Sequence, residues 1–114
     1  MNLVTVMIVE GKYDKQQIKK VLTEKIQIIC TFGTFGIEKF DDMLEKYCLD
    51  DCDVFILVDA DESGEELRKK LNRELPHAYN LYIPEEFREV EATPLNVLAR
   101  ILLPHFEVNI NFLM

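Results

Sequence analysis

The central stretch of this sequence is Val54-Phe55-Ile56-Leu57-Val58-Asp59-Ala60-Asp61, in which five apolar residues run directly into two acids. An apolar run of this length, with no polar alternation, is typical of a parallel strand covered on both faces. Ligands of open α/β sheets bind at the carboxyl ends of such strands. The stretch therefore predicts a central strand that delivers two carboxylates to a binding edge.

Two earlier apolar runs end in a similar way. Residues 3–9 are followed by Glu10-Gly11-Lys12, and residues 26–32 are followed by Gly33-Thr34. If the first and third strands are parallel neighbours, Glu10 meets the two acids that follow the third strand. Three carboxylates at one edge of one sheet favour a divalent cation.

Apolar residues at helical spacing follow each run, and they predict helices over about 15–23, from Ile37 onward, and up to Leu75. The first and third helices each begin with the spacing of a capping box, Asp14 with Gln17 and Ser63 with Glu66. In the third helix a stripe of leucines is predicted to face the core. Its basic residues are predicted to face elsewhere: Arg68, Lys69, Lys70 and Arg73.

The remaining segments complete an α/β order. Residues 78–83 predict a fourth strand, and Thr93 with Pro94 predicts the start of a last helix. Apolar and polar residues alternate over 106–112, which indicates an extra edge strand or a strand that pairs with a second copy in a homodimer. We expect a Rossmann-like three-layer α/β fold with a mainly parallel sheet of about four strands and helices on both faces. The loop over 84–92 is expected to flank the site.

Composition limits the class of protein. With 114 residues and 48% hydrophobic content, the chain has enough material for one domain over 1–114. Its core covers about 3–85, and a C-terminal helix and tail cover 93–114. No apolar run is long enough to cross a bilayer, and residues 1–9 lack the features of a signal peptide, so we expect a cytoplasmic protein without membrane contact. Three cysteines, an odd number, argue against a disulfide framework.

The net charge of −8 argues against a general nucleic-acid coat protein, which would need a basic surface. The sequence also shows neither a basic groove nor interleaved aromatic residues that would recognise bases. The nature of the substrate, RNA or DNA, therefore stays open.

The three motifs together carry a resemblance to a known family. Glu-Gly after a first strand, Gly-Thr after a second, and Asp-x-Asp-x-x-Gly after a third resemble the Toprim domain over roughly 3–85, and in particular its small stand-alone bacterial members. The chain is similar to the Toprim domains of the ribonuclease that matures ribosomal RNA and of bacterial primases. The resemblance implies that Glu10 acts as general acid or base and that Glu10, Asp59 and Asp61 bind Mg²⁺, with Mn²⁺ as a substitute.

Phosphoryl transfer at a phosphodiester is the reaction that this set of residues favours. Lys12 is a candidate for catalysis and for holding phosphate. Further candidates for contact with phosphate are Gly11, Gly33, Thr34, Gly64 and Arg88. The three glycines also have a simpler explanation, because tight strand-to-helix turns need positive φ or close backbone approach.

Several functions remain open from the sequence. The chain has no room for the extra elements of a topoisomerase or a primase, which leaves a Mg²⁺-dependent nuclease or ribonuclease as the favoured function. The alternative is an accessory module that binds metal and nucleic acid without turnover, within a larger nucleic-acid-processing complex. A receiver-like signalling domain would use Asp59 as phosphate acceptor, but it expects paired acids after the first strand and a lysine after a fifth. A haloacid-dehalogenase-type phosphatase would carry Asp-x-Asp after its first strand.

Overall fold

The computed structural model describes residues 4–32 and 37–114. Its sheet contains four strands, β1 (Thr5–Val9), β2 (Gln27–Cys30), β3 (Asp53–Leu57) and β4 (Tyr79–Leu81), in the order β2-β1-β3-β4. Every pair of neighbouring strands is parallel. The predicted adjacency of the first and third strands is confirmed, because β1 pairs with β3 from Thr5 opposite Asp53 to Ile8 opposite Ile56.

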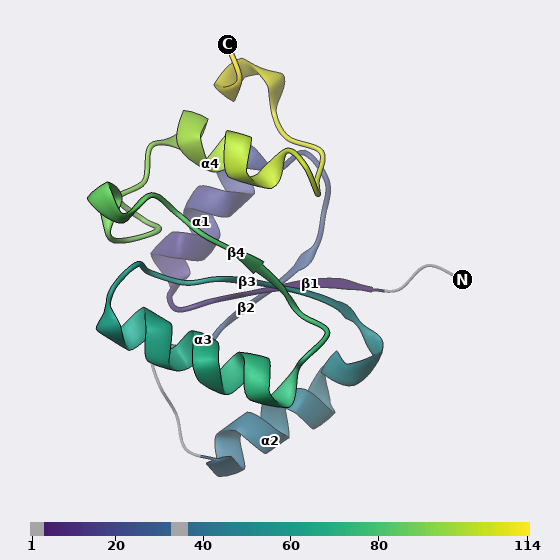
Figure 1. Ribbon diagram of the computed structural model, residues 1–114. Helices are drawn as coiled ribbons and strands as arrows, with labels where there is room; N and C mark the ends of the chain where they lie inside the picture. Colours follow the sequence, from purple (N-terminus) through teal and green to yellow (C-terminus); the bar gives the residue numbers. More distant parts are fainter. Residues whose placement is uncertain (1–3, 33–36) are drawn as a thin grey trace.

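Helices cover both faces of the sheet, as Figure 1 shows. On one face lie α1 (Lys12–Val21) and α4 (Leu95–Leu102), and on the other lie α2 (Ile37–Lys46) and α3 (Glu62–Glu74). Alternate residues of β1 serve the two layers, since Met7 packs in one core cluster and Ile8 in the other. The three-layer α/β architecture is therefore confirmed, with a sheet that is parallel throughout.

The helices begin at caps other than the predicted ones. Gly11 is the N-cap of α1, and its N–H donates to Asp14 Oδ2 at 3.0 Å, so that Asp14 lies in the first turn and does not precede it. Asp61 is the N-cap of α3, where its Oδ1 accepts from the N–H of Gly64 at 2.7 Å. Ser63 lies inside that helix. Aspartate is as good an N-cap as serine, and Asp61 comes first along the chain.

Arg68 departs from the prediction for the basic residues of α3, because its side chain is buried. Its guanidinium donates to Asn80 Oδ1 at 2.8 Å and to the carbonyl of Leu81 at 2.7 Å. The ring of Tyr82 lies 4.1 Å from its central carbon. The residue therefore ties α3 to β4, and burial lowers the pKa of its guanidinium.

The C-terminal tail does not extend the sheet, which corrects the predicted edge strand over 106–112. Val108 forms a single antiparallel bridge with Leu22, and Ile110–Phe112 is a short 3-10 helix. The N–H of Asn109 donates to the carbonyl of Val21 at 2.7 Å, at the end of α1. The tail satisfies the carbonyl of the last residue of α1 instead of a strand edge, and its alternation reflects the packing of Phe106, Val108 and Phe112 against the core.

Two further sequence expectations concern cysteines and membranes. Cys30, Cys48 and Cys52 are free cysteines, of which Cys52 is buried and Cys48 is exposed. Within residues 4–32 and 37–114, no helix has the length and apolar character that a membrane crossing requires.

Candidate functional site

The parallel pairing of β1 and β3 brings their terminal acids together. Glu10 follows β1 directly, and its Oε1 accepts a hydrogen bond of 3.0 Å from the backbone N–H of Asp59, two residues beyond β3. Forty-nine positions of sequence separate these two residues. At the sheet edge predicted from the apolar runs, the residues that follow β1 and β3 are therefore in direct contact.

The loop over 84–92 closes one side of this junction, as the sequence predicted. The N–H of Val90 donates to Asp59 Oδ1 at 2.8 Å, and the N–H of Ala60 donates to the carbonyl of Arg88 at 2.7 Å. Val90 is itself buried in the core cluster beside α1 and α4. The loop is thus fixed at its centre, and it holds the carboxylate of Asp59 in one orientation.

A cavity of about 350 Å³ opens between these segments. It is lined by Glu10, Gly11, Tyr13, Asp14, Phe32, Asp59 and Glu91. Two of these acids, Asp14 and Glu91, were absent from the predicted site. The motif Glu-Gly-Lys-x-Asp contains Asp14, which could have been found because the first turn of a helix after a strand lies at the same edge. Glu91 could be found only by knowing where its loop folds.

Burial and mutual repulsion raise the pKa values of the acids in this cavity. Burial raises the pKa of Asp14 to about 6, with a further contribution from the charge of Asp59. Burial also raises the pKa of Glu10 and that of Asp59, and in both cases the charge of Asp61 adds to the effect. The neighbouring Glu89 carboxyl, which shares a hydrogen bond with Glu91, raises the pKa of Glu91. A cation or a proton would relieve this repulsion.

Asp61 is held slightly apart from the other two predicted metal ligands. Its Oδ1 caps α3, and it lines a neighbouring cavity of about 340 Å³ together with Arg88 and residues of the first helical turn. Its charge still acts on Glu10 and Asp59. The predicted trio is thus a pair, Glu10 and Asp59, with a third carboxylate beside it.

The donor set fits Mg²⁺ in kind, since carboxylate oxygens are the ligands that this ion takes. Each of the three predicted ligands already accepts one backbone N–H, at Asp59, Val90 and Gly64 respectively. Within the described part of the chain, no three acids, histidines or cysteines are grouped closely enough to enclose an ion. Mg²⁺ usually keeps several waters and binds proteins through one or two carboxylates. The arrangement therefore suits a hydrated ion held by one or two of these side chains, and not a closed cage.

The two described glycines of the site play different roles. A Cβ at Gly64 would lie 2.9 Å from the carbonyl carbon of Asp59 and closer still to its oxygen, so the packing of α3 against the turn requires glycine there. Gly11 has φ of −139°, which any residue adopts, and a Cβ there would meet only Asp14 Oδ2 at 3.8 Å. The turn requirement predicted for Gly11 is therefore wrong, and no contact of the fold explains its missing side chain.

The remaining predicted phosphate contacts are dispersed. Lys12 is exposed, with its Nζ 5.1 Å from the centre of the Tyr13 ring. Arg88 is exposed and faces the cavity that contains Asp61. Gly33 and Thr34 lie outside the described residues.

Two aromatic residues of the cavity escaped the sequence prediction, which found no aromatics suited to contact with bases. Tyr13 and Phe32 line the cavity that contains Glu10 and Asp59, and their side chains are 55% and 76% exposed. They belong to different elements, since Tyr13 lies in the first turn of α1 and Phe32 follows β2. Only the folded sheet brings them to one rim, so no local sequence signal would have paired them.

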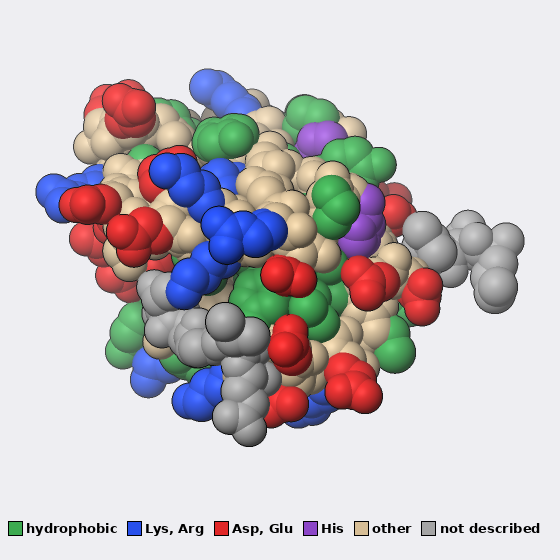
Figure 2. All heavy atoms as spheres, turned by 60° about the horizontal axis from the view of Figure 1, so that its bottom comes forward, with side chains coloured by type: hydrophobic (Ala, Val, Ile, Leu, Met, Phe, Trp, Pro, Cys, Tyr) green, Lys and Arg blue, Asp and Glu red, His purple; other side chains and the backbone are tan. Residues whose placement is uncertain are grey.

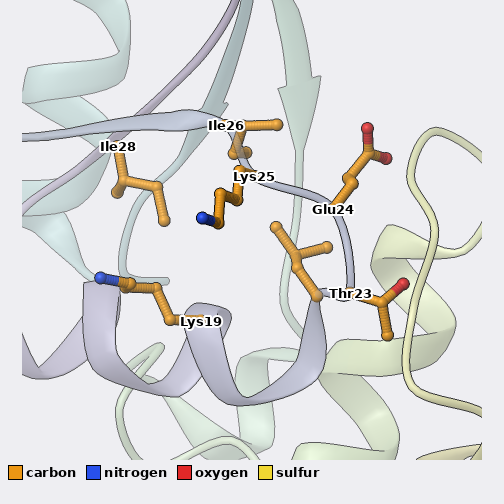
Figure 3. A pocket seen from close by; sticks show the side chains of 7 residues that line it. Lys19, Thr23, Glu24, Lys25, Ile26 and Ile28 are labelled. Carbon is orange, nitrogen blue, oxygen red and sulfur yellow. The ribbon is translucent and has the colours of Figure 1, made fainter.

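A further cavity, of about 390 Å³, lies at the opposite edge of the sheet, between the end of α1 and the start of β2 (Figure 3). Lys19 and Lys25 flank its apolar wall, and Figure 3 shows Thr23 and Glu24 extending away from it. The carboxylate of Glu24 accepts the N–H of Glu107 at 2.7 Å in the tail. This cavity lies between two packed segments. Its described lining lacks a cluster of acids like the one at the carboxyl ends of the strands.

Comparison with known proteins identifies relatives. A family model described as Toprim domain matches residues 5–92. The uncharacterized protein YusF of Bacillus subtilis is 49% identical over 98 residues, which cover 86% of this chain and 66% of YusF. Ribonuclease M5 of Mycoplasma genitalium is 30% identical over 78 residues, which cover 68% of this chain and 42% of that enzyme. This chain therefore spans less than two thirds of the length of either relative.

A solved structure matches over the whole length. A small TOPRIM domain protein from Bacillus stearothermophilus superimposes with a TM-score of 0.90 at 42% sequence identity. The match covers 100% of this chain and 96% of that one. The helix α4 and the tail, which lie beyond the family match, therefore belong to the shared architecture of the two proteins.

Proposed function

The chain belongs to the Toprim domain family, and we propose that it performs Mg²⁺-dependent phosphoryl transfer on a phosphodiester of nucleic acid, as a small nuclease or ribonuclease. Family members act on nucleic acids. The similarity to ribonuclease M5 covers 68% of the chain and favours RNA as the substrate. Because the chain spans only 42% of that enzyme, its substrate need not be the same.

The single observation that carries the proposal is the hydrogen bond of 3.0 Å between Glu10 Oε1 and the N–H of Asp59. It fixes two acids of separate motifs at one junction, beside a cavity large enough for a phosphate and its sugar. Buried, mutually repelling carboxylates with raised pKa values are typical of sites that bind cations or transfer protons.

Each residue of the candidate site has a role in the proposed reaction that follows from its position. Asp59 and Asp61 would hold Mg²⁺, whose role when bound is to neutralise charge on the phosphate oxygens. Glu10, with its raised pKa, would take the proton of the attacking hydroxyl as a general base or donate its own proton to the leaving oxygen as a general acid. Gly11 lines the cavity and has no side chain, so a phosphate could approach its backbone closely. Lys12, the next residue along the chain, is exposed and would supply a positive charge nearby.

Thermal melting with and without MgCl₂ tests the metal site. Asp59→Asn keeps the acceptor for the N–H of Val90 but removes the charge, so we expect the Mg²⁺ response to disappear. For the wild type, a ligand at 100 times its dissociation constant stabilises by about 2.7 kcal/mol. Asp53→Asn is the matched control, since it makes the same change at the amino end of the same strand. Equal magnesium shifts in wild type and Asp59→Asn would contradict the assignment.

Cleavage assays test turnover. Labelled structured RNA, single-stranded RNA and single-stranded DNA are incubated with MgCl₂ and with wild type or Glu10→Gln. The amide keeps the acceptor for the N–H of Asp59 but cannot exchange the proton, so we expect cleavage by the wild type and its loss in the variant. A Glu10→Gln variant as active as the wild type would remove Glu10 from the chemistry.

A second function, a metal- and nucleic-acid-binding accessory module without turnover, is favoured by one observation. All three predicted ligands are already engaged by backbone N–H groups, as expected of a site that is stable without an ion. This module would bind Mg²⁺ and nucleic acid but cleave none of the three substrates. In either case we propose a cytoplasmic protein, with a homodimer or a larger nucleic-acid-processing complex as its setting.

A further inference from the structure

Two exposed aromatic rings border the acidic cavity. Tyr13 and Phe32 are 55% and 76% exposed, and both line the cavity with Glu10 and Asp59. Single exposed aromatic side chains are common on protein surfaces. Two from separate elements that meet at the mouth of one cavity, beside its carboxylates, are a feature that the core does not require.

The backbone presents Phe32 in an unusual conformation. Its φ of 56° lies in the left-handed region, which is unfavourable for a residue with a Cβ. Its N–H donates to the carbonyl of Glu10, at 2.6 Å, so the segment that follows β2 is held beside the segment that carries the acid. Strained residues of this kind persist where the surrounding structure fixes them, and they gather at functional sites.

The charge around the cavity makes phosphate contacts a poor source of affinity. The chain has a net charge of −8, and the described residues that line the cavity include four acids and no basic residue. The exposed basic side chains of α3, Lys69, Lys70 and Arg73, lie on a different layer. Figure 2, which turns the face with α2 and α3 forward, shows Lys and Arg side chains gathered in one part of it. A nucleic acid at the acidic cavity must therefore gain affinity from contacts other than ion pairs.

We propose that Tyr13 and Phe32 stack on unpaired bases on either side of the phosphate that enters the cavity. The substrate is then a single-stranded segment or an unpaired loop, since the bases of a uniform duplex are already stacked. Base-on-aromatic stacking contributes about 1–3 kcal/mol per base and does not depend on phosphate charge. The Nζ of Lys12 lies 5.1 Å from the centre of the Tyr13 ring, beside the proposed stacking position. The inference rests on the proposed function, because it names the substrate class of the same site.

Fluorescence anisotropy with a labelled oligothymidylate, in CaCl₂ to separate binding from turnover, tests the inference. Tyr13→Leu and Phe32→Leu keep apolar bulk and remove the ring, and each should weaken binding about 5- to 150-fold. Tyr13→Phe should bind like the wild type. Tyr79→Leu is the matched control, since Tyr79 is 51% exposed but does not line this cavity.

A comparison of different oligonucleotide probes provides a second test of the inference. An abasic oligomer with the same sugar-phosphate backbone should bind the wild type as weakly as oligothymidylate binds the leucine variants, and a blunt duplex should bind weakly as well. Wild-type affinity in both leucine variants, equal affinity for the abasic oligomer, or no binding of oligothymidylate at all would each overturn the inference.

Failure of the inference and failure of the proposed function give different results. If the leucine variants bind like the wild type while Asp59→Asn loses its Mg²⁺ response and Glu10→Gln loses cleavage, only the stacking contacts are refuted. If the leucine variants lose binding but no substrate is cleaved, the aromatic contacts stand and the nuclease is refuted.

Discussion

Gly11 and Gly64, the two described glycines of the site, lack a side chain for different reasons. Gly64 is required by the fold, because a Cβ at this position would clash with the backbone carbonyl of Asp59. Gly11 adopts an extended conformation and faces open space in the cavity. The absence of a side chain at Gly11 therefore indicates room for a ligand, whereas the absence at Gly64 indicates room for the protein itself.

This difference predicts that the same substitution affects stability strongly at Gly64 and weakly at Gly11. Gly64→Ala should lower the free energy of unfolding by more than about 2 kcal/mol, because a methyl group cannot fit against the Asp59 carbonyl. Gly11→Ala should change it by less than about 1 kcal/mol, the range of an N-cap change. Gly11→Ala should nevertheless weaken binding of the oligonucleotide. Urea unfolding gives the stabilities, and a Gly11→Ala variant as unstable as Gly64→Ala would refute this assignment.

Asp14 predicts a pH dependence of stability. Its pKa in the folded state, about 6, lies above the ordinary value of 3.8, so folding favours its protonated form. The stability that protonation contributes is complete below about pH 4 and is lost as the pH rises through 6. Asp14→Asn keeps an acceptor for the N–H of Gly11, so without divalent cations it should be more stable than the wild type at pH 8, by roughly 1–2 kcal/mol.

The control for this measurement is Asp41→Asn, which changes an exposed acid of α2. Urea unfolding of all three proteins at pH 5 and pH 8 would reveal the effect. The advantage of Asp14→Asn should be smaller at pH 5 than at pH 8, because the folded wild-type carboxyl is then mostly protonated, and it should vanish only below about pH 4, where the unfolded chain is protonated as well. An advantage that is the same at both values would show that charge is not its cause.

Among the secondary-structure elements, the strands were predictable and the ends of helices were not. Unbroken apolar runs identified β1 and β3 because both faces of a central parallel strand are buried. The start of α3 was ambiguous, since Asp61 and Ser63 are both good N-caps and only the tight approach of Gly64 selects the first. The alternation in the tail had the period of a strand but serves to bury Phe106 beside the end of α1.

The same comparison of sequence prediction with structure explains which residues of the candidate site were missed. Glu10, Asp59 and the flanking loop followed from strand order alone, because parallel strands bring their carboxyl ends together. The aromatic rim of Tyr13 and Phe32 depends on where two separate turns point after folding, which spacing along the chain does not record. The burial of Arg68 depends on partners in β4, so the pattern of α3 alone placed it with the exposed basic residues.

Arg68 makes a prediction about the junction of α3 with β4. Arg68→Lys keeps the charge but cannot reach both Asn80 Oδ1 and the carbonyl of Leu81, which leaves a buried acceptor unpaired. We expect a loss of about 1–3 kcal/mol in the free energy of unfolding. Arg73→Lys, an exposed change on the same helix, is the control and should have almost no effect. Equal stabilities of the two variants in urea would contradict the role of the buried contacts.

Across the whole molecule, the C-terminal helix and tail share a core with the sheet. Leu98, Leu102 and Phe106 are buried in the same cluster as Met7 of β1 and Ile18 of α1. Packing of this kind couples the last twenty residues to the first. We propose on this basis that residues 1–114 unfold as one domain.

Phe106→Ala tests that coupling. Removing this buried ring should lower the free energy of unfolding by about 3–5 kcal/mol. Far-ultraviolet circular dichroism and near-ultraviolet absorbance should still report one coincident transition. Phe87→Ala is the control, because Phe87 belongs to neither core cluster. Two separate transitions, with the tail melting first, would refute a single cooperative unit.

All four strands run in the same direction, so the connecting segments of this protein fall into two groups. One group leaves the carboxyl ends of the strands, and the other enters their amino ends. Those that leave the carboxyl ends carry the acids, the aromatic rings and the fixed loop over 84–92, and their lengths set the spacing of these groups. Those that enter the amino ends, such as residues 47–52, carry none of them. Extra chain gained at the second group during evolution would therefore leave the spacing of these groups unchanged.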